Sequence, residues 1–345
     1  MATADITVRG AGIFGLSIAW VLTQRGARVQ VIDPNGPAAG ASGGIVGALA
    51  PHVPENWNPK KQFQLESLLM ADAFWAGVEA AGGASSGYAR TGRCQPIADD
   101  AARDLAQRRS GTAATLWGDA ATWVVRPVEN PAWAANSPTG LEIFDTLSAR
   151  IHPRQACNAL VAALKAHGTD IKAEGRDTGI TIHATGVAGL EALNAQNPRM
   201  VGAGIKGQAA LLDFAAPDDP QLFADTLHII PHADGTTAIG STTERDYDTP
   251  TSTDGQLDDI IARARAAVPA LKDAKVKARW AGLRPRSRSR APMLGPWPDQ
   301  PGHYIANGGF KIGFGMAPKV AQTMADLILD GADTIPQGFE VAASL

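Results

Sequence analysis

Three glycines near the start of the chain have the spacing of a nucleotide-binding turn. Gly10, Gly12 and Gly15 fit the pattern G-x-G-x-x-G, and a short apolar strand, 6–8, precedes them. The first glycine permits a tight turn, the second lets the backbone approach a pyrophosphate, and the third lets the following helix pack closely on the strand. The helix expected over 14–24 directs its free N–H groups and its positive dipole end at the same phosphates. This spacing predicts a bound dinucleotide; the alternative is a glycine-rich turn that binds no ligand.

An acidic residue lies where such a ligand would place its ribose. The second expected strand, 28–32, ends at Asp33, eighteen residues beyond Gly15. A carboxylate at this place accepts hydrogen bonds from ribose hydroxyls and repels a 2′-phosphate. The sequence therefore disfavours NADP as the ligand.

The bulk composition is ordinary for a globular protein of enzyme size. The 345 residues are 45% hydrophobic and 19% charged, with a net charge of −3, and a chain of this length is expected to form two domains. The small negative charge gives no general attraction to nucleic acid or to an anionic membrane. No apolar run approaches the length of a membrane span, and the run 13–22 coincides with the expected helix rather than with a signal peptide.

The two cysteines, Cys94 and Cys157, are far apart in the sequence. Cysteine pairs that bind metal or exchange electrons stand closer together, as in C-x-x-C. We therefore expect two thiols without a catalytic role, no metal site, and a reducing, cytoplasmic location.

The order of the expected elements is unusual for a nicotinamide dehydrogenase. A hairpin over 227–241 turns at Asp234-Gly235, and helices are predicted at 60–81, 99–109, 152–168, 256–268 and 317–329. No second βαβ unit follows Asp33, and cofactor-binding elements return only near 150–190 and at the C-terminus. An interleaved arrangement of this kind favours FAD, an elongated ligand that extends along a whole domain.

Short motifs spread over nearly the whole chain add to the glycine turn. They are Gly40-Ala-Ser-Gly-Gly44, Ile151-His-Pro, Ala184-Thr-Gly186, Ile205-Lys-Gly-Gln208, Trp280-Ala-Gly-Leu-Arg-Pro285, Ala291-Pro-Met-Leu-Gly295 and Met316-Ala-Pro318. With these motifs the sequence resembles the D-amino-acid-oxidase superfamily of FAD enzymes, and most closely its glycine oxidase and sarcosine oxidase branch. The loop 40–51 and Gly92-Arg-Cys also resemble the FAD-dependent oxidase half of the bifunctional tRNA wobble-uridine enzyme.

The resemblance implies a mixed α/β (α+β) fold. A Rossmann-like FAD-binding domain, made of 1–85, 150–205 and 284–345, would be interleaved with a smaller antiparallel-sheet substrate domain, made of 86–149 and 206–283. Covalent members of the family attach the flavin to a cysteine near the block 280–285, and this chain has no cysteine there. Non-covalent FAD is therefore expected.

The glycine turn and the resemblance together assign a cofactor site. Small residues in the loop 40–44 would let it lie against the flavin, and the Ser42 hydroxyl can bond to cofactor oxygens. The amides of the loop 307–315 would form an anion nest for charge that develops on the flavin, where Lys311 can add a positive charge. The expected cofactor-binding residues are Gly10, Gly12, Ile13, Phe14, Gly15, Asp33, Ala41, Ser42, Gly44, Ile45, Gly186, Lys311, Ile312, Gly313 and Phe314.

Arg284 is the residue that we expect to bind the substrate. It follows the apolar segment 280–283, where a guanidinium without a partner is costly, and a carboxylate would match its charge and its planar fork. In the family an arginine at this place clamps the amino-acid carboxylate; the alternative is a structural ion pair with a local Asp or Glu. His228 aligns with a tyrosine of the glycine oxidase substrate pocket. Lys311 and His52 are further candidates, the latter facing the flavin ring.

Some features depart from the family pattern. Lys311 stands where arginine is common, which weakens a second carboxylate contact. The segment between Ile171 and Ile182 is much shorter than usual, so part of the small sheet and its contacts to adenine are in doubt. Arg9 replaces a small or apolar residue before the first glycine. Either a solvated edge or the binding of an anionic substrate or RNA backbone explains the alternating Arg286, Arg288 and Arg290.

The resemblance implies oxidation of the C–N bond of a small amine or amino acid, as in glycine or D-amino-acid oxidase. Hydride would pass to flavin N5 and leave an imine that hydrolyses, with oxygen or another acceptor taking the electrons. Arg284 would orient the substrate, and no general base is assigned. Two alternatives stay open: an FAD oxidase that modifies a wobble uridine of tRNA, and a flavin-binding module without catalysis.

Overall fold

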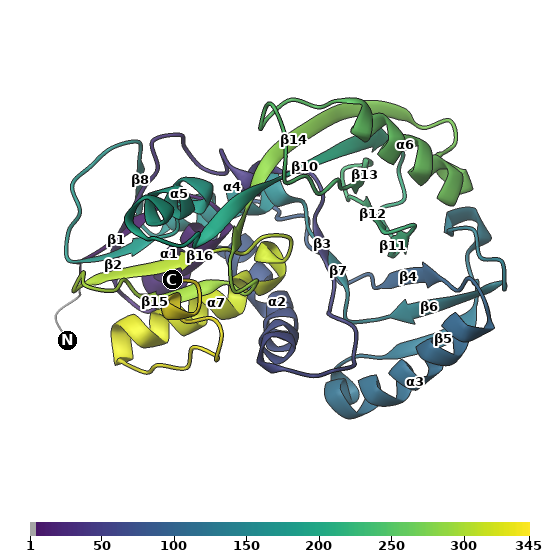
Figure 1. Cartoon of the computed structure of the whole chain (residues 1–345), viewed down its shortest axis with the longest axis horizontal. Helices are drawn as coiled ribbons and strands as arrows, with labels where there is room; N and C mark the ends of the chain where they lie inside the picture. The colour runs from purple at the N-terminus through teal and green to yellow at the C-terminus, as the bar shows by residue number, and fades with distance from the viewer. Residues whose placement is uncertain (1–4) are drawn as a thin grey trace.

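Parallel strands form the smaller of the two main sheets in the computed structural model, which describes residues 5–345. The strand order is β15-β16-β9-β1-β2-β8, and neighbours are parallel except at the edge, where β15 is antiparallel to β16 (Figure 1). The strands are β1 (Asp5–Arg9), β2 (Arg28–Ile32), β8 (Asp170–Lys172), β9 (Ile180–His183), β15 (Met293–Pro296) and β16 (His303–Asn307).

Helices pack around this sheet and contribute most of its core. α1 (Ile13–Gln24) packs against α4 (Pro153–Ala166) and α7 (Gly313–Asp330), and α2 (Pro59–Gly82) packs against the same two helices. α5 (Gly186–Gln196) lies on β16 and on two long strands of the second sheet. Trp20 of α1 and Trp75 of α2 are fully buried in this core, so the position of α1 is fixed by packing along its whole length.

The second sheet has eight strands in the order β14-β10-β13-β12-β11-β4-β6-β5. Its pairs are antiparallel apart from β11 and β4, which run parallel. The strands are β4 (Arg93–Pro96), β5 (Trp123–Pro127), β6 (Leu141–Asp145), β10 (Gly202–Asp213), β11 (Gln221–Ala224), β12 (Leu227–Pro231), β13 (Thr237–Gly240) and β14 (Lys275–Ser287). A short pair, β3 (Ala48–Leu49) and β7 (Ala149–Arg150), lies between the two sheets in the centre of Figure 1.

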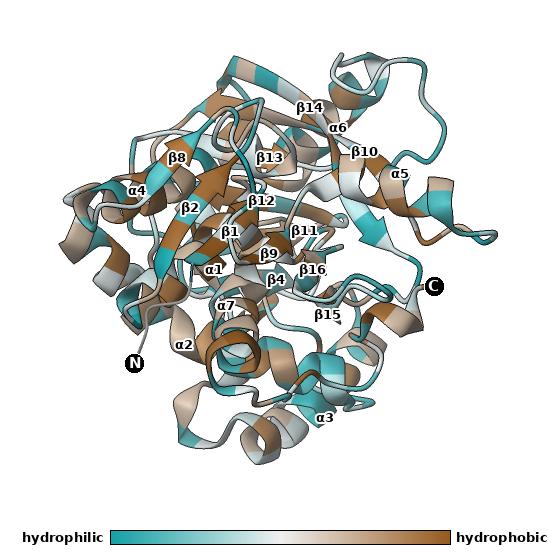
Figure 2. Cartoon of the chain, turned by 90° about the vertical axis from the view of Figure 1, so that its left-hand side faces the viewer, coloured by the Kyte–Doolittle hydropathy of each residue, from teal (hydrophilic) through white to brown (hydrophobic). Residues whose placement is uncertain are grey.

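Helices cover the outside of this second sheet. α6 (Gly255–Ala267) packs on one face through Leu257, Ile260 and Ile261, and α3 (Asp100–Trp117) packs beside β5. Figure 2 shows the difference in character: hydrophobic residues run along β1 and β2 of the parallel sheet, whereas α3 carries many hydrophilic residues. The other face of the second sheet, opposite α6, is therefore the one that can contact the rest of the molecule.

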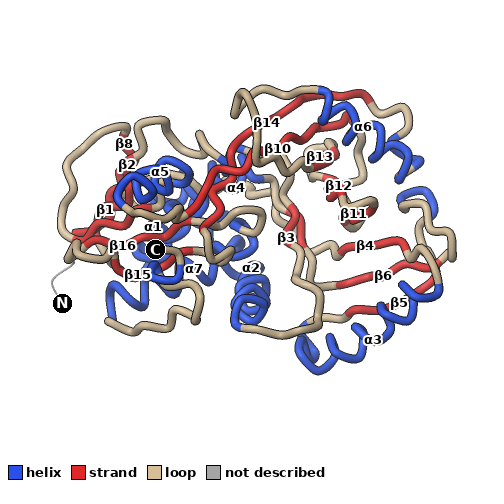
Figure 3. Tube along the Cα trace, in the orientation of Figure 1, coloured by secondary structure: helices blue, strands red, loops and turns tan. Residues whose placement is uncertain are grey.

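Two long strands tie the sheets together. β10 and β14 pair along their length, from Gly202 with Ser287 to Asp213 with Lys275. At one end Gly202 packs against Leu190 of α5, and further along β10 packs against α6. Figure 3 shows the pair running from the helix-flanked parallel sheet into the antiparallel one. Residues near 284 consequently lie at the junction of the two sheets.

The fold class predicted from the sequence is confirmed, but two predicted helix ends were wrong. The helix expected to end at 109 continues to Trp117. Ala113 and Trp117 are buried in the core, and this packing outweighs the weak helix-forming tendency of Gly111 and Thr112.

The last helix starts earlier than expected, at Gly313 rather than near 317. From the sequence, the glycine-rich residues before 316 were expected to form a loop. In the structure Pro318 lies in the second turn, where it cannot donate to the carbonyl of Phe314, so the helix loses one hydrogen bond there. Part of the loop predicted over 307–315 is thus helical.

Neither a helix that could span a membrane nor a cluster of metal ligands is found in residues 5–345, and both cysteines lie in this range. No helix among residues 5–345 is both long enough and apolar enough to cross a membrane. Nor do three His, Cys, Asp or Glu side chains gather anywhere in this range to hold a metal ion. Cys94 and Cys157 are buried free thiols, and burial raises the pKa of each to about 12, which keeps them protonated near neutral pH.

Gly15 has no room for a side chain, and this can be tested by stability. A Cβ atom on Gly15 would lie 1.9 Å from the carbonyl oxygen of Gly10, so Gly15→Ala must displace α1 or the turn before it. We expect the free energy of unfolding, measured in urea, to fall by about 1–3 kcal/mol. The control is Gly111→Ala inside α3, where the Cβ position is open, and it should raise stability by about 0.5–1 kcal/mol. Equal stability of the two variants would contradict the packing argument.

Candidate functional site

The turn between β1 and α1 leaves no space for side chains. Gly10 has a φ of +104°, and a Cβ atom there would lie 2.3 Å from the carbonyl oxygen of Ala184. A Cβ atom on Gly12 would lie 3.2 Å from the Ser42 Oγ. The backbone is thus bare where three segments of the chain meet, as the close approach of a phosphate requires.

Three helices begin at the same edge of the parallel sheet. In each of them, the side chain of the N-cap residue accepts no hydrogen bond from the first turn of the helix. α1, α5 and α7 follow the adjacent strands β1, β9 and β16, and their N-caps are Gly12, Thr185 and Ile312. By contrast, α2, α3, α4 and α6 are capped by the side chains of Asn58, Asp99, His152 and Asp254. Within residues 5–345, the bare N-termini are therefore concentrated where an anionic ligand would bond to their N–H groups.

Asp33 lies at the end of β2 and braces the glycine turn. Its Oδ2 accepts a hydrogen bond from Ala11 N at 2.8 Å, and its Oδ1 accepts one from Asn35 N at 2.9 Å. A carboxylate offers about four lone pairs, so both oxygens can still accept hydrogen bonds from ribose hydroxyls. The residue is half-buried, which leaves one side open to a ligand on the turn.

The loop 40–45 connects the glycine turn to the second sheet. Ser42 Oγ accepts a hydrogen bond from Ile13 N at 2.9 Å, which leaves the hydroxyl proton for a ligand oxygen. A Cβ atom on Gly44 would lie 3.5 Å from the ring of Trp280. The predicted residue Ala41 begins the 3₁₀ turn Ala41–Gly43. The predicted residue Ile45 directly follows Gly44 and is buried.

The loop before α7 closes over α1. A Cβ atom on Gly309 would lie 2.8 Å from the ring of Phe14, and Asn307 Nδ2 donates to the carbonyl of Gly186 at 2.8 Å. The N-cap and the first two residues of α7 are Ile312, Gly313 and Phe314. The glycine turn, Asp33 and the N-termini of α1, α5 and α7 therefore meet in one place, and these residues fit a dinucleotide with a central anionic group.

One face of the antiparallel sheet carries the candidate substrate residues. Directly paired residues place their side chains on the same face, and such pairs cross five strands through Phe223, His228, Gly240, Ala209 and Trp280. Arg284 lies four residues after Trp280 in β14, so its side chain is on this face too. A Cβ atom on Gly240 would lie 2.9 Å from Val46, so the face looks toward the loop 40–47. We call it the site face.

Arg284 is a buried cation that forms no ion pair with a carboxylate of the described chain. Its Nη1 donates to Ser241 Oγ at 2.8 Å, and its Nη2 donates to the carbonyls of Thr242 at 2.6 Å and Lys206 at 3.1 Å. Its Nε is buried without a partner among the described residues. Gly207 provides the space, because a Cβ atom there would lie 2.1 Å from Nη2. The structural ion pair left open by the sequence is thus not seen.

The negative charge of Glu244 acts on Arg284 from the side of the sheet opposite the site face. Burial lowers the pKa of Arg284 to about 10, and the nearby charge of Glu244 opposes this shift, so the guanidinium stays protonated at neutral pH. Glu244 itself forms an ion pair with Lys206 at 3.4 Å. Both line a hollow of about 430 Å³ together with Asp254. Glu244 therefore supports the charge of Arg284 without neutralising it on the site face.

Lys311 lies within electrostatic range of both Arg284 and His228. The surrounding protein and the charge of Arg284 lower the pKa of Lys311 to about 8. Burial, and then the charges of Arg93 and Lys311, lower the pKa of His228 to about 3, so its imidazole is neutral at pH 7. Arg284 and Lys311 thus lie near one another beside the Phe310 ring, and Lys311 also acts on His228.

Sequence reasoning missed three residues of this region as site residues. Trp280 was recognised only as part of a motif, although its ring lies 3.5 Å from the position of a Cβ atom on Gly44. Arg93 forms a buried ion pair with Asp145 at 2.9 Å, and its one signal was the Gly92-Arg-Cys motif. Phe310, whose ring centre lies 5.6 Å from the Arg284 Cζ, had no signal in the sequence.

Other candidates lie elsewhere. The Oε1 of Gln64 in α2 contacts both the backbone N and the ring Nδ1 of His52, so that imidazole is held toward α2. Arg9 pairs with Asp177 at 2.8 Å, in the short loop that joins β8 to β9 and replaces a longer segment. Of the alternating arginines 286, 288 and 290, Arg288 and Arg290 lie exposed on the surface and Arg286 is half-buried.

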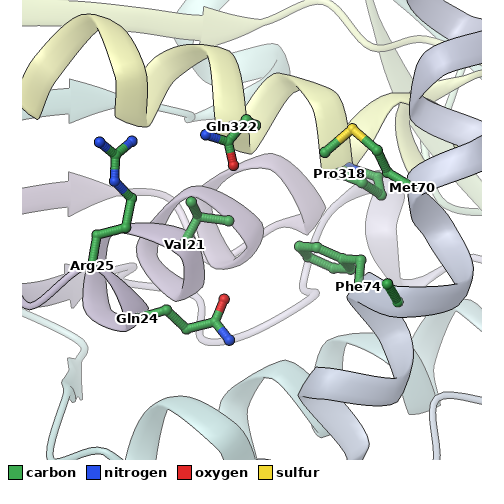
Figure 4. A pocket seen from close by; sticks show the side chains of 8 residues that line it. Val21, Gln24, Arg25, Met70, Phe74, Pro318 and Gln322 are labelled. Carbon is green, nitrogen blue, oxygen red and sulfur yellow. The ribbon is translucent and has the colours of Figure 1, made fainter. Parts of the chain in front are cut away.

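A hollow of about 330 Å³ between α1, α2 and α7 is separate from this site (Figure 4). Val21, Gln24 and Arg25 line it from the last turns of α1, facing Phe74 of α2 and Gln322 of α7. Phosphates bind at the amino ends of helices, not at the carboxyl ends. We therefore do not assign the ligand of the glycine turn to this hollow.

Comparison with known proteins agrees with the resemblance seen in the sequence. The family model described as DAO, FAD dependent oxidoreductase, matches residues 5–327. Over 141 residues the chain is 36% identical to a glycine oxidase of Pseudomonas aeruginosa, and the match covers 39% of each chain. Over 361 residues it is 26% identical to a bifunctional ThiO/ThiG protein of Nostoc sp., covering 95% of this chain and 53% of that one. These matches span well under two thirds of either relative.

The fold is shared with a solved structure. A glycine oxidase from Geobacillus kaustophilus superposes with a TM-score of 0.82 at 20% sequence identity, over 98% of this chain and 99% of that one. At this identity the likeness establishes the fold alone. Because the family model matches the chain almost from end to end, the protein belongs to the family of FAD-dependent oxidoreductases.

Proposed function

We propose that the protein oxidises the C–N bond of a small amine that carries a carboxylate, such as an amino acid, with FAD as its cofactor. The observation that carries this proposal is Arg284, a buried and protonated guanidinium that has no carboxylate partner in the described chain and lies on the site face. A substrate carboxylate would supply the missing counter-charge. The glycine oxidases among the relatives favour the same class of substrate.

Arg284 would hold the substrate in one orientation. Three of its five N–H groups are used by Ser241, Thr242 and Lys206, which leaves Nε–H and one Nη1–H, on different edges of the guanidinium, as the donors that a carboxylate oxygen could reach. Since the protein holds the guanidinium at three points, a carboxylate bound to it would fix the position of the substrate Cα. Fixing the reacting carbon in this way is the main contribution that positioning residues make to a rate.

The remaining residues of the site would tune its polarity. When bound, the flavin would accept the hydride from the substrate carbon. Neutral His228 and the ring of Trp280 would exclude water from the site face, while Lys311 and the N-terminus of α7 would offer positive charge to an anionic edge of the cofactor. Because the amine would bind in its neutral form, this proposal assigns no general base.

We further propose that FAD is bound without a covalent link and in the predicted domain. Neither Cys94 nor Cys157 lies in the segment of Arg284. The parallel sheet draws its strands from 5–32, 170–183 and 293–307, and the antiparallel sheet draws its strands from 93–145 and 202–287. This membership supports the division into 1–85, 150–205 and 284–345 for FAD, and 86–149 and 206–283 for the substrate.

Replacing Arg284 tests the proposed function directly. Under anaerobic conditions, a panel of amines, N-methyl amino acids and D-amino acids should include a carboxylate-bearing compound that bleaches the flavin of the wild-type protein. Arg284→Ala should retain the flavin but lose about 2–5 kcal/mol of transition-state stabilisation, roughly thirtyfold to several thousandfold in kcat/KM. Arg284→Lys should recover only part, because an ammonium cannot match the carboxylate fork.

An amine without a carboxylate is the internal control for this test, since it should react similarly with wild type and both variants. Wild-type rates for Arg284→Ala on the best carboxylate substrate would show that the arginine is only structural. The proposed function would then lose its main support.

The mode of cofactor binding gives a further prediction. Acid precipitation of the wild-type protein should leave all FAD in the supernatant. Asp33→Ala should raise the dissociation constant for FAD by about tenfold, because the ribose hydroxyls lose a charged acceptor, while Asp104→Ala in the exposed part of α3 should leave it unchanged. FAD fluorescence measures both quantities. Flavin in the precipitate would exclude non-covalent binding, and unchanged affinity of Asp33→Ala would exclude the ribose contact.

The lowered pKa of Lys311 predicts that the affinity of the site for a carboxylate depends on pH. Its pKa is lowered to about 8, so its charge is present below that pH and is lost as the pH rises through it. Between about pH 7 and 9, Arg284 stays charged and His228 stays neutral. The affinity for acetate, followed by the flavin absorbance, should therefore fall over this range in the wild type and stay nearly constant in Lys311→Arg. The same decline in Lys311→Arg would assign the pH dependence to another group.

A further inference from the structure

Three cations surround the ring of Phe310, where the loop 308–312 meets β14. The Cζ atoms of Arg284 and Arg286 each lie 5.6 Å from the ring centre, and the Nζ of Lys311 lies 5.9 Å from it. In the described chain, none of these three side chains forms an ion pair with a carboxylate. We call the three cations and the ring the Phe310 cluster.

The backbone holds the Phe310 cluster together. Arg284 and Arg286 are two residues apart in β14, so both side chains are on the site face. Phe310 N donates to the carbonyl of Pro285 at 2.9 Å, and Gly309 forms a β-bridge with Arg286. Phe310 has a φ of +45°, a left-handed conformation that is costly for an aromatic residue and persists only where its surroundings fix it. The cations are therefore held near one another by structure rather than by chance contact.

The charge of the Phe310 cluster exceeds what one carboxylate can neutralise. Arg286 is half-buried, and its pKa is lowered by burial and by the positive charges of Arg245 and Arg290. Arg284 in turn lowers the pKa of Lys311. Glu244 acts on Arg284 from behind, through its pair with Lys206. A monocarboxylate bound to Arg284 would leave Arg286 as an unneutralised cation beside the ligand.

The two guanidinium groups are close enough to share one small ligand. Each Cζ lies 5.6 Å from the same ring centre, so the groups cannot be further apart than twice that distance. Each charge-assisted N–H···O contact adds about 2.7–2.9 Å. A compound whose two carboxyl carbons are three or four bonds apart can therefore reach both.

We propose that the substrate is an amine with two acidic groups, the first bound by Arg284 and the second by Arg286. This inference rests on the proposed function, because it adds a second anionic contact to the same site. Arg286 is then a specificity-determining residue: it discriminates between diacids and monoacids but takes no part in the oxidation itself. The chemical class includes N-carboxymethyl amino acids and acidic amino acids.

Binding of unreactive acids tests this inference without relying on turnover. Acetate and succinate are titrated against the FAD-loaded protein, and the change in flavin absorbance gives each dissociation constant. In the wild type, succinate should bind about tenfold more tightly than acetate or better. Arg286→Ala and Arg286→Gln should abolish this preference, because each loses much more affinity for succinate than for acetate. The matched control is Arg288→Ala, which removes the same charge from an exposed position in the same segment and should keep the preference.

Equal affinity of the wild type for acetate and succinate would overturn the inference. So would a succinate preference that survives in both Arg286 variants, or loss of FAD from both, which would assign Arg286 to the cofactor. Oxidation is the separate arm: N-carboxymethylglycine should bleach the flavin more efficiently than N-methylglycine in the wild type, and the two should react alike in Arg286→Ala. If no amine bleaches the flavin but the Arg286-dependent succinate preference is found, the proposed oxidation fails and the diacid site stands.

Discussion

Arg284 carries a full positive charge in a place with little access to water, and much of the antiparallel sheet is arranged around that charge. Glycines at 207 and 282 clear the surface on which the guanidinium and the Trp280 ring lie. Backbone carbonyls of β10 and of the segment after β13 take up its N–H groups, and the charge of Glu244 on the opposite side offsets part of the effect of burial on its pKa. These contacts fix the cation without neutralising it, so the remaining attraction is available to a ligand.

The two sheets present positive electrostatic potential by different physical means. The parallel sheet gathers the N-termini of α1, α5 and α7 at one edge, where backbone N–H groups and helix dipoles act on an anion without any charged side chain. The antiparallel sheet presents the guanidinium groups of Arg284 and Arg286 on the site face instead. The loop 308–312 belongs to both arrangements, because it leads into α7 and also packs on the end of β14. A dinucleotide and an acidic substrate can thus meet where these two kinds of positive potential overlap.

Local sequence signals were sufficient for elements whose function depends on the backbone. The spacing of Gly10, Gly12 and Gly15 predicted β1, the turn and α1, and Asp33 marked the end of β2, because turns and close approaches restrict residue type directly. The partners of Arg284 could not be predicted in this way. Ser241 and Thr242 reach it only because β14, β10 and β13 pair in one register, which depends on the packing of the whole sheet. The same holds for Phe310 beside Arg284, and for the last two turns of α3, which depend on the burial of Ala113 and Trp117.

The bare N-termini of α1, α5 and α7 also affect how much folded protein a cell retains. Without an anion at that edge, several N–H groups on three helices of the parallel sheet lack a strong acceptor. A cofactor that binds the native state but not the unfolded chain shifts the folding equilibrium in proportion to the logarithm of its free concentration. Chains made while flavin is scarce would spend more time locally open and be more exposed to proteases. The abundance of the folded protein would then follow the supply of flavin, with no dedicated regulator.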